Sequence, residues 1–151
     1  MKIKKFIKVV TAFIAVLFAV YLLISIVGTQ IVLAEVKSFG LAVSLSDRIA
    51  ATLHDIVGLA EMLPWLIVPA LLVAFIVAAL GKRFMGGNRT YWYLAAGLTS
   101  LPAGLILLEL VLGGAPYAAA RTGFGLSLIA LCGMAGGWLF ARLTQKRGAL
   151  N

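Results

Sequence analysis

The side chain with the clearest potential for chemistry is Glu109, an acidic residue inside a long apolar segment of the chain. A charged group in a membrane span costs free energy, so such a residue is a functional candidate by default. Glu109 follows Trp92 by seventeen residues, or about 26 Å along an α-helix rising about 1.5 Å per residue. The hydrocarbon core is about 30 Å thick, so we expect Glu109 near a membrane boundary rather than the midplane. There it would form an ion pair with Arg121; a role in binding protons, ions or a ligand is the alternative.

A second candidate for chemistry is His54, the single histidine of the chain, which precedes Asp55. The two residues could form an acid–base pair or a pH-sensitive surface contact. We favour a solvated histidine on a helix edge, because the chain has no second histidine and only Cys132 as a thiol. This inventory excludes the common zinc and two-histidine haem sites, and no catalytic triad or phosphate-binding glycine motif is present. We therefore predict no catalysis, no metal and no cofactor.

The composition indicates which elements must position these residues. Hydrophobic residues make up 63% of the 151 residues and charged residues 12%, and apolar runs of about twenty residues are typical of membrane-spanning helices. The sequence predicts a single domain, an all-α integral membrane protein with four transmembrane helices, at about residues 9–30, 64–80, 92–112 and 124–143. Although the net charge is +8, the basic residues flank the apolar runs, which favours membrane orientation over nucleic-acid binding.

Between the first two spans, residues 46–62 are predicted to form an amphipathic helix with Ser46 as its N-cap. Apolar residues recur there at helical spacing on one side, and polar residues lie on the other. The apolar set is Ile49, Leu53, Ile56, Val57 and Ala60, and the polar set is Arg48, Thr52 and Asp55. We expect this helix to lie on the extracytoplasmic membrane surface or to cap the bundle.

The distribution of lysine and arginine predicts the orientation of the spans. Ten basic residues fall at the two termini and in residues 81–90, whereas Lys37, Arg48 and Arg121 fall on the other side. Because basic residues are retained in the cytoplasm, both termini are predicted to be cytoplasmic in a cytoplasmic (inner) membrane.

Small residues on the spans predict close helix contacts. They are Ala96, Ser100 and Gly104 on the third span, and Gly133 and Gly137, at G-x-x-x-G spacing, on the fourth. We expect contacts with membrane lipids and with a membrane-protein partner or further copies of the chain. The favoured function is that of an accessory, assembly or regulatory subunit of a larger membrane complex. The alternative is an oligomeric transporter of small solutes or ions that uses Glu109.

Overall fold

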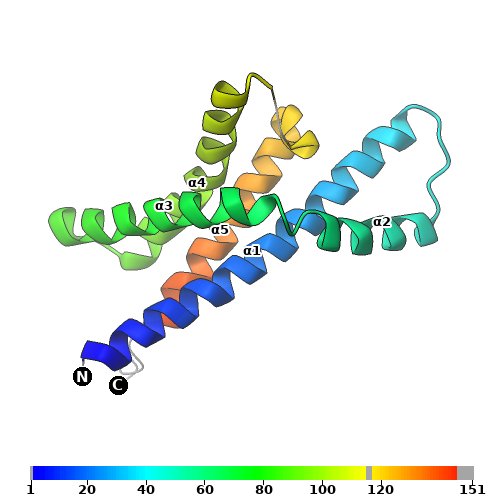
Figure 1. Ribbon diagram of the computed structural model, residues 1–151. Helices are drawn as coiled ribbons and strands as arrows, with labels where there is room; N and C mark the ends of the chain where they lie inside the picture. The colour runs from blue at the N-terminus through cyan, green and yellow to red at the C-terminus, as the bar shows by residue number, and fades with distance from the viewer. Residues whose placement is uncertain (1, 115–116, 146–151) are drawn as a thin grey trace.

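The computed structural model describes residues 2–114 and 117–145, and these form helices joined by short connections (Figure 1). The elements are α1 (Lys2–Ser38), α2 (Leu45–Gly58), α3 (Leu63–Met85), α4 (Arg89–Leu112), the 3-10 helix η1 (Ala118–Arg121) and α5 (Gly123–Thr144). No strand occurs in the described ranges. Four helices, α1, α3, α4 and α5, are long and apolar enough to cross a membrane. The predicted all-helical class with four apolar helices is confirmed.

Helix α1 is longer than the predicted first span. It runs without a break through 37 residues to Ser38, whereas the prediction ended the span at residue 30. Thr29 is accommodated because its hydroxyl donates to the Ser25 carbonyl 2.7 Å away, inside the helix. At about 1.5 Å per residue, α1 is about 55 Å long and exceeds a hydrocarbon core of about 30 Å.

The beginning of α2 corrects the sequence prediction. Ser44, not Ser46, is the N-cap, and Ser44 and Asp47 form a reciprocal capping box. The Asp47 amide donates to the Ser44 hydroxyl at 3.1 Å, and the Ser44 amide donates to the Asp47 carboxylate at 2.9 Å. Helix α2 ends at Gly58, and residues 59–62 form a turn into α3. A capping box needs a serine three residues before the acidic residue, and Ser44 is the serine at that distance from Asp47.

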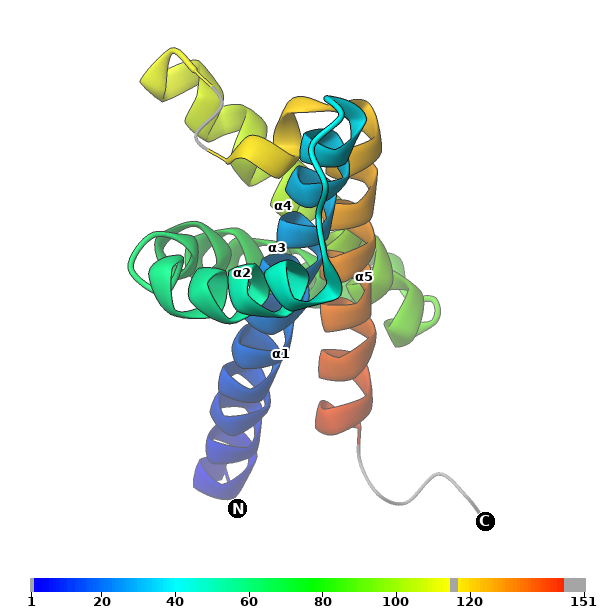
Figure 2. The ribbon, with the colours of Figure 1, turned by 90° about the vertical axis from the view of Figure 1, so that its right-hand side faces the viewer.

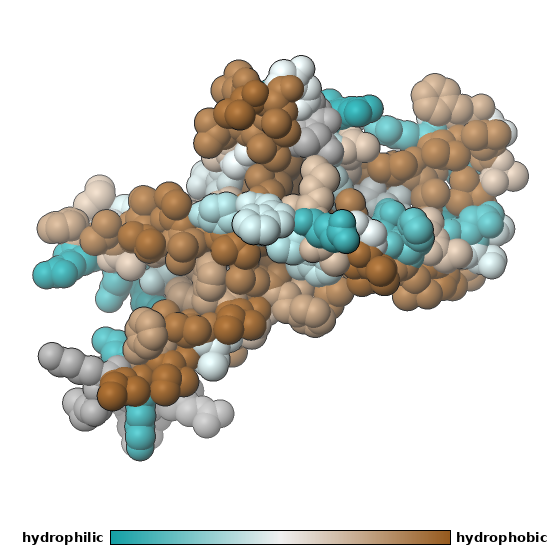
Figure 3. All heavy atoms as spheres, in the orientation of Figure 1, coloured by the Kyte–Doolittle hydropathy of each residue, from teal (hydrophilic) through white to brown (hydrophobic). Residues whose placement is uncertain are grey.

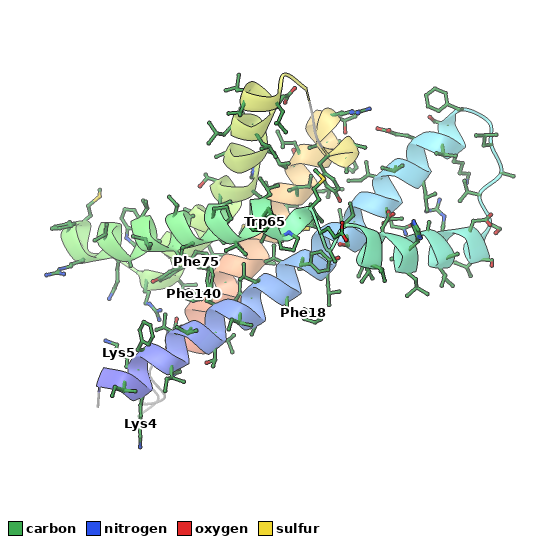
Figure 4. The ribbon with its side chains drawn as sticks, in the orientation of Figure 1. Lys4, Lys5, Phe18, Trp65, Phe75 and Phe140 are labelled. Carbon is green, nitrogen blue, oxygen red and sulfur yellow. The ribbon has the colours of Figure 1, made fainter. Side chains whose placement is uncertain are left out.

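The bundle is held together by α5, which packs between α4 and α1; the second view shows α5 running beside α1 (Figure 2). Each of the four long helices contributes one ring to an aromatic cluster, made of Phe13, Phe75, Tyr93 and Phe140. Phe75 stacks on Phe140 with a centroid distance of 4.5 Å (Figure 4). The Tyr93 ring lies 5.5 Å from the Phe75 ring. Offset and edge-to-face pairs of this kind stabilise a core beyond their buried area.

The start of α1 and the end of α5 lie at the same end of the bundle. The Lys8 ammonium donates to the Gln145 carbonyl at 2.7 Å. At this end Arg89 donates to the Ala141 carbonyl at 3.3 Å and also to the Thr144 hydroxyl. The positive charge on Arg89 thereby lies at the C-terminal end of α5, where cations are favoured by the helix dipole.

The outer surface of the bundle is apolar. Figure 3 shows hydrophobic residues over much of the visible face, along α1, α3 and α4. Phe18, Trp65 and Leu110 are among many large apolar side chains that are largely exposed. Contiguous apolar surface of this extent is rare on soluble monomers, so the structure supports a membrane-embedded protein.

Candidate functional site

An apolar groove of about 900 Å³ lies between α3 and α4. It is formed by the part of α3 from Leu63 to Val77 and by the part of α4 from Ala96 to Leu112. In Figures 1 and 2 the C-terminal end of α4 stands apart from α3. The described residues leave this space unfilled.

The floor of the groove carries the small residues predicted on the third span. Ala96, Ser100 and Gly104 all line it. A Cβ on Gly104 would meet the Ala70 Cβ of α3 at 3.3 Å, so this glycine lies at the narrow contact between the two helices. Small side chains permit the backbone of a further helix to approach closely.

The groove is lined almost entirely by apolar side chains. Among the side chains that line it, Thr99 and Ser100 carry hydroxyls. The Ser100 hydroxyl donates to the Gly97 carbonyl at 2.9 Å, and the Thr99 hydroxyl donates to the Ala95 carbonyl at 3.0 Å. Both hydroxyls are thus engaged within α4. The groove is suited to an apolar occupant, such as a helix or an acyl chain, and not to a polar substrate.

The glycines predicted for packing on the fourth span lie at the contact between α4 and α5. Gly133 and Gly137 are buried there. A Cβ on Gly133 would collide with the Gly97 carbonyl, and one on Gly137 would collide with the Tyr93 carbonyl. Sequence reasoning missed Gly97, which is one residue beyond Ala96 and therefore about 100° further around the helix. Gly97 of α4 is therefore directed toward α5, whereas Ala96, Ser100 and Gly104 line the groove.

The structure does not bring Glu109 and Arg121 together. Both side chains are exposed, and within the described residues no ion pair of 4.0 Å or less joins them. Glu109 lies near the end of α4, where its carbonyl accepts a hydrogen bond from the Gly113 amide at 2.9 Å. The flanking residues Leu108 and Leu112 line the groove, but Glu109 does not.

His54 and Asp55 point to different surroundings. The His54 side chain is exposed, whereas Asp55 is half-buried against α1. The Thr29 hydroxyl of α1 lies 2.7 Å from an Asp55 carboxylate oxygen and 2.7 Å from the Ser25 carbonyl oxygen, so its single hydrogen is shared between the two acceptors. His54 and Asp55 therefore do not act as a surface pair, because Asp55 is part of the contact between α1 and α2.

Asp55 is one member of a polar contact between α1 and α2. The Gln30 amide group donates to the Thr52 hydroxyl at 3.1 Å, and its oxygen accepts from the Arg48 guanidinium at 2.7 Å. The Tyr21 hydroxyl donates to the Ile56 carbonyl. The polar side of α2 thus faces the protein. The signal in the sequence was the polar pair Thr29 and Gln30 inside an otherwise apolar helix.

Tyr117 closes the same region from the connection before η1. Its hydroxyl donates to the Ile24 carbonyl at 3.0 Å, above Gly28, where a Cβ would collide with the phenol. Burial, together with Asp55 and Cys132, raises the pKa of the Tyr117 phenol.

The Ser25 hydroxyl is fully buried and has no hydrogen-bond partner in the described part of the chain.

Known proteins give no family for this chain. No family model matches it, no curated protein matches it, and no solved structure matches it. Within residues 2–114 and 117–145, no group of three or more His, Cys, Asp or Glu side chains could hold a metal ion.

Proposed function

We propose that this protein is an accessory, assembly or regulatory subunit that packs against a larger membrane complex and carries out no catalysis itself. The observation that carries the proposal is the apolar groove between α3 and α4. It is about 900 Å³ in volume, opens on the outside of the bundle and has small residues on its floor. Interfaces between transmembrane helices are enriched in such residues, because packing and not hydrophobicity drives helix association in lipid.

A membrane-spanning helix of the partner is the occupant that this geometry supports. Ala70 and Ala74 on α3 line the groove together with Ala96, Ser100 and Gly104 on α4, and Ala70 lies against Gly104 at its floor. A helix lying over this contact would gain van der Waals contacts with both α3 and α4. Transport through Glu109, the alternative from the sequence, has no supporting contact among the described residues, since Glu109 lies outside the groove lining.

Substitutions that fill the groove test this proposal. Ala103→Phe and Ala74→Phe place a ring in the groove, whereas Ala95→Phe places the same ring on an exposed position of α4 outside it. In purifications from native membranes with a mild detergent, the parent and Ala95→Phe should retain a protein partner, and the two groove variants should lose it. A parent that purifies without any other protein, or groove variants that keep the partner as Ala95→Phe does, would refute the proposal.

We further propose that the protein resides in the cytoplasmic (inner) membrane with both termini in the cytoplasm. The basic asymmetry supports this orientation. Lys8 and Arg89 also lie at the same end of the bundle, where they donate to the Gln145 and Ala141 carbonyls. Reporter fusions at Gly86 and at the C-terminus should report cytoplasm, and one at Val43 should report the exterior. An external C-terminus would overturn the orientation.

A further inference from the structure

Helix α2 is attached to the bundle by its polar side and turns its apolar side outward. Leu45, Ile49, Leu53 and Val57 are 75%, 55%, 61% and 75% exposed, and no residue of α2 is buried. A helix that lies in water on a protein surface normally has the reverse arrangement, with its apolar stripe against the core. The medium outside α2 must therefore be one in which apolar side chains are favourable.

The contacts with α1 set the depth of α2. Asp55 is level with Thr29, twenty-one residues after Lys8, or about 31 Å along α1. Ile56 is held by Tyr21, thirteen residues after Lys8, or about 20 Å along the same helix. With Lys8 at the inner boundary, the C-terminal end of α2 lies within a hydrocarbon core of about 30 Å. Its N-terminal end lies higher, among the headgroups.

The apolar side of α2 continues into the exposed surface of α3. After the turn at residues 59–62, the first turn of α3 carries Trp65, which is 84% exposed (Figure 4). Val68 and Leu72, further along α3, are also exposed. Tryptophan is enriched at the membrane interface, where its ring is apolar and its N–H reaches water. The exposed Trp65, seven residues after the end of α2, therefore indicates an outer membrane interface close to this turn.

We propose that the outward face of α2 is covered by phospholipid. In this arrangement α2 is a short helix that enters the outer interfacial layer obliquely, with Val57 and Leu53 among the acyl chains and Leu45 among the headgroups. Its polar side is sealed against Thr29 and Gln30 of α1, which satisfy hydrogen-bonding groups that lipid cannot satisfy. This inference rests on the membrane insertion proposed above, but not on the groove or its occupant.

Spin labels on single cysteines test the lipid contact. In a Cys132→Ala background, cysteine is introduced in place of Leu45, Leu53 or Val57 on α2, and in place of Leu72 on α3 as a control. The full chain is reconstituted in vesicles of phosphatidylethanolamine and phosphatidylglycerol, and collisions with oxygen and with a water-soluble nickel chelate are measured. Because oxygen concentrates in acyl chains, the oxygen-to-nickel ratio should rise from Leu45 through Leu53 to Val57 and be high at Leu72.

Other patterns overturn the inference. Nickel access at Val57 as high as at Leu45 would place the whole face in water. Low access to both reagents along α2 would mean that a protein covers it; dipolar broadening that disappears on dilution with unlabelled chain would then identify a second copy. If Leu72 is also open to nickel, the membrane insertion itself fails, so the two failures are distinguishable. Ile49→Cys supplies a second position should Val57→Cys not fold.

Discussion

The close contact between α4 and α5 leads to a strong prediction for Gly133→Ala. A Cβ at Gly133 would collide with the Gly97 carbonyl and lie 3.1 Å from the Gly97 carbonyl carbon and 3.0 Å from the Leu101 Cδ1. Ordinary contact begins at 3.4 Å, and the backbone of α4 has no rotamer by which to retreat. The two helices must separate, which we expect to destabilise the fold by about 1–3 kcal/mol, as overpacking does in other cores.

The control for this substitution is Gly123→Ala on the same helix. A Cβ at Gly123 meets nothing within 4 Å, so it adds a methyl group without a clash and should cause no loss of stability. Thermal unfolding in detergent can be followed with a thiol-reactive dye, since Cys132 is the single cysteine and is buried. For a chain of this size, each 1 kcal/mol lowers Tm by about 2–4 °C.

The double variant Gly97→Ala with Gly133→Ala sharpens the test. Both methyl groups would occupy the same gap between α4 and α5, so one separation of the helices relieves both clashes. The double variant should lose less free energy of unfolding than the two single variants lose together, as expected for residues in contact. An unchanged or raised Tm for Gly133→Ala, with Gly123→Ala as reference, would refute the close packing of these helices.

Two further predictions concern the charged groups outside the bundle core. Glu109→Gln and Arg121→Ala should each leave the free energy of unfolding within about 0.5 kcal/mol of the parent, as for surface sites; a double-mutant cycle with clear coupling would instead reveal an ion pair. Hydrogen bonds from Ser44 hold the pKa of Asp47 below its ordinary value of 3.8. The stabilisation that the ionised Asp47 carboxylate gives the folded state is therefore complete above pH 3.8. It is lost as the pH falls through the lower pKa that Asp47 has in the folded protein. A spin label at Ser46 should become mobile at low pH in the parent, and an Asp47→Asn variant should lack that transition.

Most of the fold could be predicted because apolar runs of about twenty residues have few alternatives to a helix. The errors were of two physical kinds. Ser46 was chosen as the N-cap by its proximity to the periodic segment, whereas the reciprocal bonds with Asp47 favour Ser44. The end of the first span was set at residue 30 because Thr29 and Gln30 look unfavourable in lipid. Their hydrogen-bond partners are on α2 and are distant in sequence.

The candidate site could be predicted only in part, for a related reason. The small residues Ala96, Ser100 and Gly104 were identified from their spacing, and all three line the groove. Spacing alone does not say whether a small face is filled by the chain itself. Gly133 faces Gly97 within the bundle, but the Ala96 side of α4 faces open space. That distinction depends on where α4 stands relative to α3, which is a property of the packed bundle.

The most direct test of the central claim is photo-crosslinking from inside the groove. A photoreactive amino acid replaces Val73, which is exposed and lines the groove, and Ile76, which is exposed on α3 outside it, serves as the control. After irradiation of native membranes, we expect a discrete adduct between the Val73 variant and a different membrane protein, and none from the Ile76 variant. Adducts to lipid alone from both positions would contradict it.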